Sequence, residues 1–138
     1  MEPDVRQRLT SFFAEDPRGA IAAYLFGSVA RGDDRADSDV DVAVLFDAAP
    51  PSVLSAPPFT LAGDLERALR RPVDLVVLNT ASADLVHRVL RDGQLVLDRD
   101  RARRLRFEVA KRNEYFDLEP IRRLYRRQSG SVERPATR

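Results

Sequence analysis

The segment that decides the fold is GSVARGDDRADSDVDVAVLF, residues 27–46. It follows AIAAYLF at 20–26, a short apolar run bounded by glycines that predicts a buried strand. Residues 38–46 alternate β-branched with other side chains and predict a second strand. The glycines of GSVARG bracket what is expected to be one helical turn. The turn therefore leads from one strand to another that begins with two acids, Asp39 and Asp41.

These two acids are expected to be side by side. Residues two apart in a strand project to the same face, so Asp39 and Asp41 are neighbours. Val40, Val42 and Val44 point to the opposite layer. Paired carboxylates repel, and one keeps its proton unless a cation lies between them. A third acid, Asp74, interrupts the apolar run PVDLVVLN at 72–79, a predicted third strand. If the two strands are neighbours, Asp74 completes a three-carboxylate cluster.

The cluster and the glycine-bounded turn together predict a nucleoside triphosphate site. Magnesium is held by hard carboxylate oxygens and substrate phosphates, so Asp39, Asp41 and Asp74 are the expected metal ligands and catalytic residues, with two ions in the site. Gly27 and Ser28 open a helical turn, where free N–H groups and a hydroxyl can hold phosphate oxygens.

The rest of the chain predicts an α/β domain, a small mixed β-sheet flanked by helices that lie mainly on one side. Further elements are expected as helices at about 3–15, 59–70, 82–92 and from 100 with a restart near Pro120, and as a strand at 94–98. Leu105, Val109 and Phe116 mark the expected buried side of the C-terminal helix. The proline-rich segment 47–58 is expected to be irregular.

Length and composition limit the possibilities. The 138 residues suit one domain, expected over 1–127 with 99–127 as a helical C-terminal region, before a flexible tail at 128–138. With no Cys and one His, the chain cannot form a disulfide framework, a thiolate zinc site or a histidine cluster. No apolar run approaches the roughly 20 residues of a membrane span, and no signal peptide pattern is present, which predicts a cytoplasmic protein.

Charge is unevenly divided along the chain. Residues 1–98 hold 10 Arg against 16 acids, a net charge of −6, whereas residues 99–138 hold 13 Arg and Lys against 6 acids, a net charge of +7. An acidic body and a basic C-terminal region follow. The basic run at 99–106 has no interleaved aromatic residues, so a solvated face or a partner surface is expected rather than direct nucleic-acid binding.

The pattern Gly-Ser, ten residues, Asp-x-Asp resembles the signature of the nucleotidyltransferase superfamily related to DNA polymerase β. The short length, Arg31, Gly32, Ser38 and the later segments around 107–108 and 115–120 are similar to the minimal nucleotidyltransferase (MNT) group, which includes the MntA-type antitoxins. The resemblance covers about residues 20–127. It implies the nucleotidyltransferase fold and Mg-ATP-dependent transfer of AMP to a tyrosine of a HEPN-domain ribonuclease toxin. Such AMPylation silences the toxin and implies a hetero-oligomer with it.

By this resemblance, Asp39 and Asp41 match the metal-binding pair, Asp74 the third carboxylate, and Gly27 and Ser28 the triphosphate loop. Asp74 is then the natural general base for the tyrosine hydroxyl, because it would be nearest the acceptor.

Alternatives remain for these residues and for the function. Arg31 is either a phosphate clamp, since guanidinium binds phosphate in a bidentate way, or a solvated surface residue. Ser28 could be only a helix cap, and the aspartates surface acids at a loop–strand junction. His87 is expected to be structural or solvent-facing, whereas Tyr115, Phe116 and Tyr125 are expected to be packing residues. Two rival functions remain. One is an antitoxin that acts by contact alone through its C-terminal helices, and the other is a transferase for a small molecule such as an aminoglycoside.

Two other motifs are excluded. The glycine spacing at 27–32 matches a P-loop, but acids stand where its Lys and Ser or Thr are required. The acidic ladder before the second strand lacks the glycine and the final Glu of an EF-hand.

Overall fold

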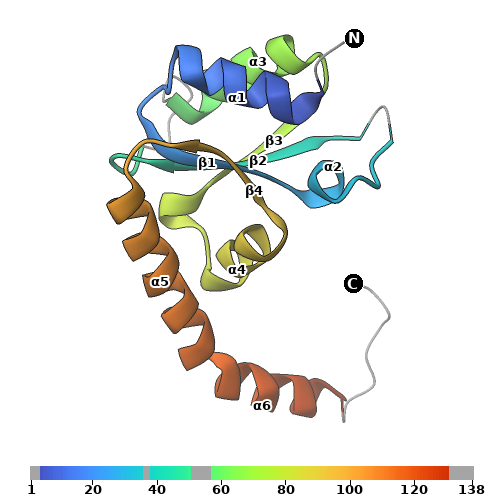
Figure 1. Cartoon of the computed structure of the whole chain (residues 1–138). Coiled ribbons are helices and arrows are strands. Elements are labelled where there is room, and N and C mark those ends of the chain that lie inside the picture. Colours follow the sequence, from blue (N-terminus) through green and yellow to red (C-terminus); the bar gives the residue numbers. More distant parts are fainter. Residues whose placement is uncertain (1–3, 36–37, 51–56, 131–138) are drawn as a thin grey trace.

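A computed structural model describes residues 4–35, 38–50 and 57–130 (Figure 1). Its elements are α1 (Val5–Glu15), β1 (Ala20–Phe26), α2 (Gly27–Arg31), β2 (Val40–Phe46), α3 (Pro57–Leu69), β3 (Val73–Val77), the 3₁₀ helix η1 (Leu78–Thr80), α4 (Ala83–Asp92), β4 (Gln94–Asp98), α5 (Arg101–Asp117) and α6 (Glu119–Gly130). The predicted elements are all present. Within the predicted irregular segment, 51–56 lie outside the described residues, as do 131–138 of the predicted tail; α6 continues to Gly130.

The four strands form one mixed sheet in the order β3-β2-β1-β4. β1 is antiparallel to both of its neighbours, β2 and β4, whereas β2 and β3 run parallel. A parallel pair needs a crossover connection, and α3 provides it. The mixed α/β architecture agrees with the prediction. It also makes β2 and β3 neighbours, which the three-carboxylate cluster requires.

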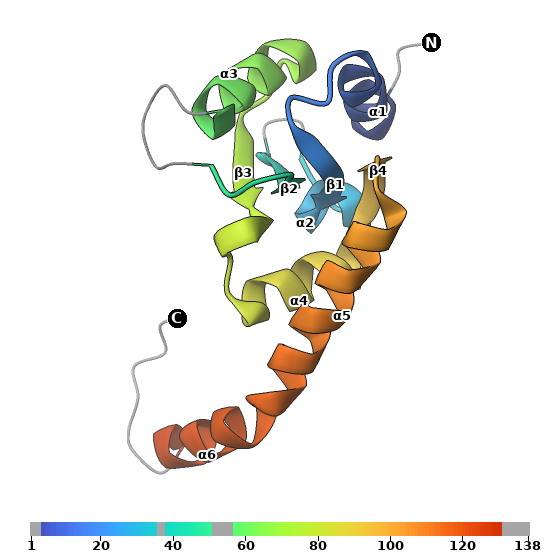
Figure 2. The same cartoon turned by 90° about the vertical axis from the view of Figure 1, so that its left-hand side faces the viewer.

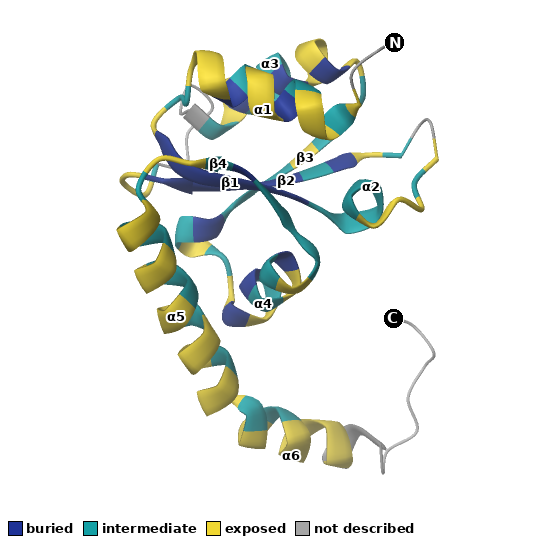
Figure 3. Ribbon diagram, in the orientation of Figure 1, coloured by how far each residue is buried: buried dark blue, intermediate teal, exposed yellow. Residues whose placement is uncertain are grey.

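Helices cover both faces of the sheet, so the expectation of helices mainly on one side is wrong (Figures 1 and 3). α1 and α3 pack on one face with Val42 and Val44, whereas α4 and the start of α5 pack on the other with Ala43 and Leu45. These four β2 residues are all buried. A strand that is apolar on both sides needs two covering layers. In β2 the small side chain of Ala43 among the valines conceals this pattern in the sequence.

The C-terminal helix α5 is held to the sheet mainly by polar contacts, with Phe107 as its apolar contact with the core. The Tyr24 hydroxyl donates to Glu108 Oε2 at 2.5 Å, and Arg104 pairs with Glu108 at 2.9 Å and with Asp98 at 3.0 Å. Burial and the hydrogen bond to Glu108 raise the pKa of the Tyr24 hydroxyl far above its ordinary value. The network fixes where α5 leaves the body (Figure 2).

The predicted buried side of α5 is wrong, because Leu105, Val109 and Phe116 are exposed by 40%, 48% and 56%. The helix instead turns Phe107 and the polar residues of the network toward the body. Periodicity selected the apolar stripe because it cannot recognise a helix face that packs through partly buried ion pairs.

Of the other aromatic residues predicted to pack, Tyr115 does so and Tyr125 does not; the partner of Tyr115 is His87, which is expected to be structural or solvent-facing. The rings of Tyr115 in α5 and His87 in α4 stack with their centroids 3.8 Å apart. Arg122 of α6 lies over the Tyr115 ring, 3.9 Å from its centroid, and pairs with Asp84 at 3.0 Å. Tyr125 is 71% exposed. The first helical turns of α6 are therefore fixed against the body through charges and rings.

Two leucines test which helices stabilise the fold. Leu65 of α3 is fully buried, and Leu65→Ala should lower the free energy of unfolding by about 2–5 kcal/mol. Leu124 of α6 is 53% exposed, so Leu124→Ala should cost less than about 0.5 kcal/mol. Urea denaturation followed by circular dichroism measures both. Similar losses for the two variants would contradict the packing described above.

Candidate active site

The parallel pairing of β2 with β3 brings two of the predicted aspartates together. Asp41 and Asp74 are direct register partners, so their side chains leave the sheet on the same face. Val40 and Val42, on either side of Asp41, are buried in the opposite layer with α1 and α3. The two acids therefore lie on the α4 side. Asp39 stands directly before β2, two residues from Asp41, and both Asp39 and Asp74 are exposed.

The charge of the third acid, Asp39, also acts on Asp41. Partial burial raises the pKa of the Asp41 carboxyl above its ordinary value, and the negative charges of Asp74 and Asp39 raise it further. Arg31 opposes this effect and lowers the pKa. The charges of Asp39 and Asp74 thus both act on the Asp41 carboxyl. Such mutual repulsion is a property that a bound cation would relieve.

Gly27 gives Asp41 the space it occupies. Its backbone is in the left-handed region, with φ of +77°, and an added Cβ would overlap the Asp41 carboxylate, reaching 2.9 Å from its Cγ. Both conditions exclude other residues at this position. Ser28 follows in the first turn of α2, partly buried, and its carbonyl accepts from the N–H groups of Gly32 and Asp33. The predicted phosphate turn thus directly adjoins the acidic cluster.

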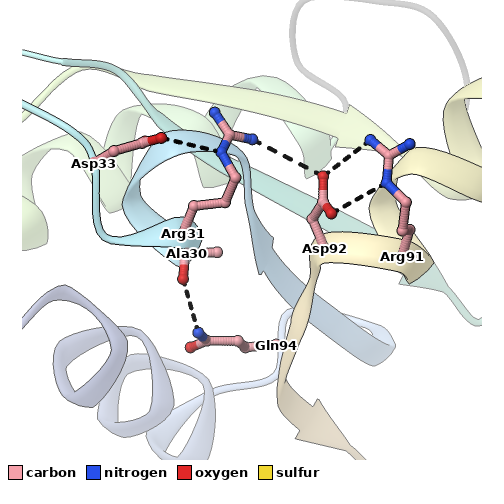
Figure 4. A network of polar contacts seen from close by, with 6 residues as sticks. All are labelled: Ala30, Arg31, Asp33, Arg91, Asp92 and Gln94. Atoms are coloured by element: carbon pink, nitrogen blue, oxygen red, sulfur yellow. Dashed lines mark hydrogen bonds and ion pairs between the residues drawn. The ribbon is translucent and has the colours of Figure 1, made fainter.

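Arg31 lies in a polar network that joins α2 to α4 and β4 (Figure 4). Its Nε lies 3.4 Å from Asp33 Oδ2, and its Nη1 lies 3.9 Å from Asp92 Oδ2. Arg91 also holds Asp92, at 3.1 Å. Gln94 Nε2 donates to the Ala30 carbonyl at 3.0 Å. Arg31 is half exposed, so its guanidinium can be reached from solvent while remaining aligned by two carboxylates.

Sequence reasoning missed Asp92 and Gln94, which position α2. A signal for Asp92 was available, because an acid in the last turn of a helix meets the negative end of the helix dipole and needs cationic partners. The hydrogen bond from Arg91, together with the charge of Arg31, lowers the pKa of the Asp92 carboxyl. Gln94 carried no comparable signal, since it begins an ordinary strand.

The donor chemistry of the cluster fits a hard divalent cation such as Mg²⁺. Asp41 and Asp74 offer carboxylate oxygens on one face, with Asp39 directly before the strand, and the charges of Asp39 and Asp74 both repel that of Asp41. As the side chains of residues 4–35, 38–50 and 57–130 lie, no three acidic, His or Cys groups are close enough to enclose one ion.

The chain is similar both to a protein-family model and to solved structures. Residues 7–102 match the model of the family described as polymerase beta, nucleotidyltransferase. A chain of a toxin–antitoxin complex crystallised with AMP-PNP is 27% identical with a TM-score of 0.75, and the match covers 90% of this chain and 97% of that one. A candidate minimal nucleotidyltransferase is 32% identical with a TM-score of 0.53, over 67% of this chain and 96% of that one.

A third structure supports the fold alone. It is a chain from the complex of a tri-AMPylated Shewanella oneidensis HEPN toxin with an MNT antitoxin, 24% identical with a TM-score of 0.71, matched over 90% of this chain and 98% of that one. No curated protein matches the sequence. No helix in the described part of the chain has the length and apolar character needed to cross a membrane.

Gly27 can be tested against a matched glycine. Gly27→Ala and Gly32→Ala both place a Cβ on a left-handed backbone, at φ of +77° and +82°, and each should cost about 1–2 kcal/mol of stability. Only at Gly27 does the Cβ also displace Asp41, because nothing lies within 4 Å of a Cβ at Gly32. Gly27→Ala should therefore be less stable in urea and should alone shift the NMR signal of the Asp41 carboxyl carbon. Equal effects of both substitutions would contradict the close approach.

The carboxylate cluster predicts a specific pH dependence of stability. Because the pKa of Asp41 is raised above 3.8, the folded protein binds this proton more tightly than the unfolded chain. The resulting stabilisation is full below about pH 3.8 and is lost as the pH rises through the folded pKa. Asp74→Asn removes one cause, so it should lower the NMR titration midpoint of Asp41 and reduce this loss of stability.

Glu15→Gln, at an exposed acid of α1 on the opposite face, is the control and should change neither quantity. An Asp41 midpoint that is the same in Asp74→Asn and in the unmodified protein would show that the two carboxylates do not interact.

Proposed function

This chain belongs to the polymerase beta nucleotidyltransferase family, and we propose that it is a Mg²⁺- and ATP-dependent adenylyltransferase of the MNT type. We infer that it acts in the cytoplasm as the antitoxin of a HEPN-domain toxin, transferring AMP to a tyrosine of that toxin. The observation that carries the proposal is the pairing of Asp41 with Asp74 beside Gly27. The similarity to a toxin–antitoxin chain crystallised with AMP-PNP supports both the nucleotide and the partner.

In this proposal Asp74 has two tasks, as a metal ligand and as the base, and each of the other predicted residues has one. Asp39, Asp41 and Asp74 hold the metal ions, while Gly27 and Ser28 hold the triphosphate. Bound Mg²⁺ supplies positive charge to the phosphates and to the acceptor oxygen. Arg31, aligned by Asp33 and Asp92, contacts a phosphate from the exposed side of α2.

The transfer forms one bond to the α-phosphorus of ATP and breaks another. The tyrosine oxygen forms a bond to the α-phosphorus of ATP, the bond from that phosphorus to the bridging oxygen breaks, and pyrophosphate leaves. The proton of the tyrosine hydroxyl passes to Asp74. Asp74 suits this task because its side chain is exposed on the outer strand of the sheet, where an acceptor can approach it.

Access to the site favours a protein acceptor. Asp39 and Asp74 are exposed, and α5 and α6 extend away from the sheet rather than closing over it (Figures 1 and 2). A small acceptor such as an aminoglycoside would need an enclosing pocket to be held in place. The side chain of a tyrosine on a partner protein is instead positioned by the contact between the two proteins.

The direct test is transfer of label from [α-³²P]ATP to the cognate HEPN-domain protein in the presence of Mg²⁺. Asp39→Asn should reduce the rate about 1000-fold, since a metal site contributes several kcal/mol to the transition state. Glu15→Gln should retain the rate. No label on the partner at saturating Mg²⁺ and ATP would contradict the proposed activity.

The same variants separate the rival functions. If Asp39→Asn neutralises the toxin in cells as well as the unmodified protein does, neutralisation occurs by contact alone. Label that appears on an aminoglycoside and not on the HEPN protein would establish a small-molecule acceptor.

A further inference from the structure

Exposed apolar side chains are concentrated on the C-terminal helices. Of the eight large hydrophobic residues exposed in the described part of the chain, seven lie between residues 105 and 125: Leu105, Val109, Phe116, Leu118, Ile121, Leu124 and Tyr125. A soluble domain normally scatters such residues, and a concentration of them marks an interaction surface. These two helices therefore carry a surface that the chain itself does not cover.

The clearest part of this surface is on α6. Ile121, Leu124 and Tyr125 follow one another at i, i+3 and i+4, so they share one side of the helix, here called the α6 apolar face. Their exposed fractions are 63%, 53% and 71%. The polar residues Glu119 and Arg122 are much less exposed, and Arg122 contacts the body. α6 thus turns Glu119 and Arg122 inward and leaves its apolar side chains outward, the reverse of a helix that packs on its own domain.

Contacts with the body hold α6 in place before any partner binds. Arg122 pairs with Asp84 of α4 and lies over Tyr115, which in turn stacks on His87. A helix that is already oriented loses less conformational entropy on binding than a disordered segment. The α6 apolar face is therefore prepared for docking.

The charge around this face indicates the nature of its occupant. Residues 101–127 contain ten Arg and Lys and four Asp and Glu, a net charge of +6. A symmetric dimer formed through this face would place two such basic surfaces opposite each other, which is unfavourable. An acidic partner surface is favoured instead.

We propose that the α6 apolar face is the docking surface for the toxin, and that the toxin presents an apolar patch surrounded by Asp and Glu. This inference rests on the proposed function, which makes a HEPN-domain protein the partner. It adds that recognition is separate from the aspartate cluster. One part of the chain holds the toxin while another carries out the transfer.

The test compares a double variant with an exposed apolar residue elsewhere. Leu124→Ser/Tyr125→Ser should weaken calorimetric binding of the cognate HEPN protein about 30-fold or more, as expected for residues at the centre of an interface. Phe59→Ser, on α3 and 52% exposed, should leave the affinity unchanged. Both variants should bind AMP-PNP with Mg²⁺ like the unmodified protein and should keep its circular dichroism spectrum. Added salt should weaken toxin binding of the unmodified protein.

The outcomes distinguish this inference from the proposed function. Unchanged toxin affinity of the double variant would overturn the docking surface and leave the proposed function standing. Failure of the unmodified protein to bind the HEPN protein would contradict both. A dimer of the unmodified chain that the double variant loses would show that a second copy occupies the face, and would overturn the inference.

Discussion

The parallel pairing of β2 and β3 is the constraint on which the rest of the molecule depends. It places Asp41 opposite Asp74, although 32 positions separate them in the sequence, and it does so against the repulsion of their charges. The apolar layers on both sides of β2 supply the stabilisation that makes this arrangement possible, because the strand cannot shift its register without exposing Val42 and Val44. The acidic cluster is thus held by residues that face away from it.

The position of Gly27 follows from the same constraint. With Asp41 fixed by strand pairing, the turn after β1 passes so close to the carboxylate that no Cβ fits. Arg31 is fixed from the other direction, through Asp92 at the end of α4. The sheet and one helix therefore determine the geometry of the site, while its surface remains accessible from solvent.

Much of this could be predicted from the sequence, and the errors have physical causes. Alternation along β2 placed Asp39 and Asp41 on one side, and an acid within an apolar run identified Asp74, because both signals are local. The two-sided cover of the sheet was missed, since Ala43 is small and weakens the apolar signal of its face. The orientation of α5 was missed because Glu108 and Arg104 pack inward as partners, and a single sequence does not show which charges will meet.

Asp74 has a second consequence that follows from the strand order. β3 is an outer strand of the sheet, so one of its sides presents backbone groups that another chain could pair with. The strand is otherwise composed of valine and leucine, the composition that favours intermolecular β-pairing. A charged side chain in such a strand opposes growth of the sheet from one molecule to the next. The acid for which we propose a catalytic role is therefore also placed to oppose edge-to-edge association of the sheet.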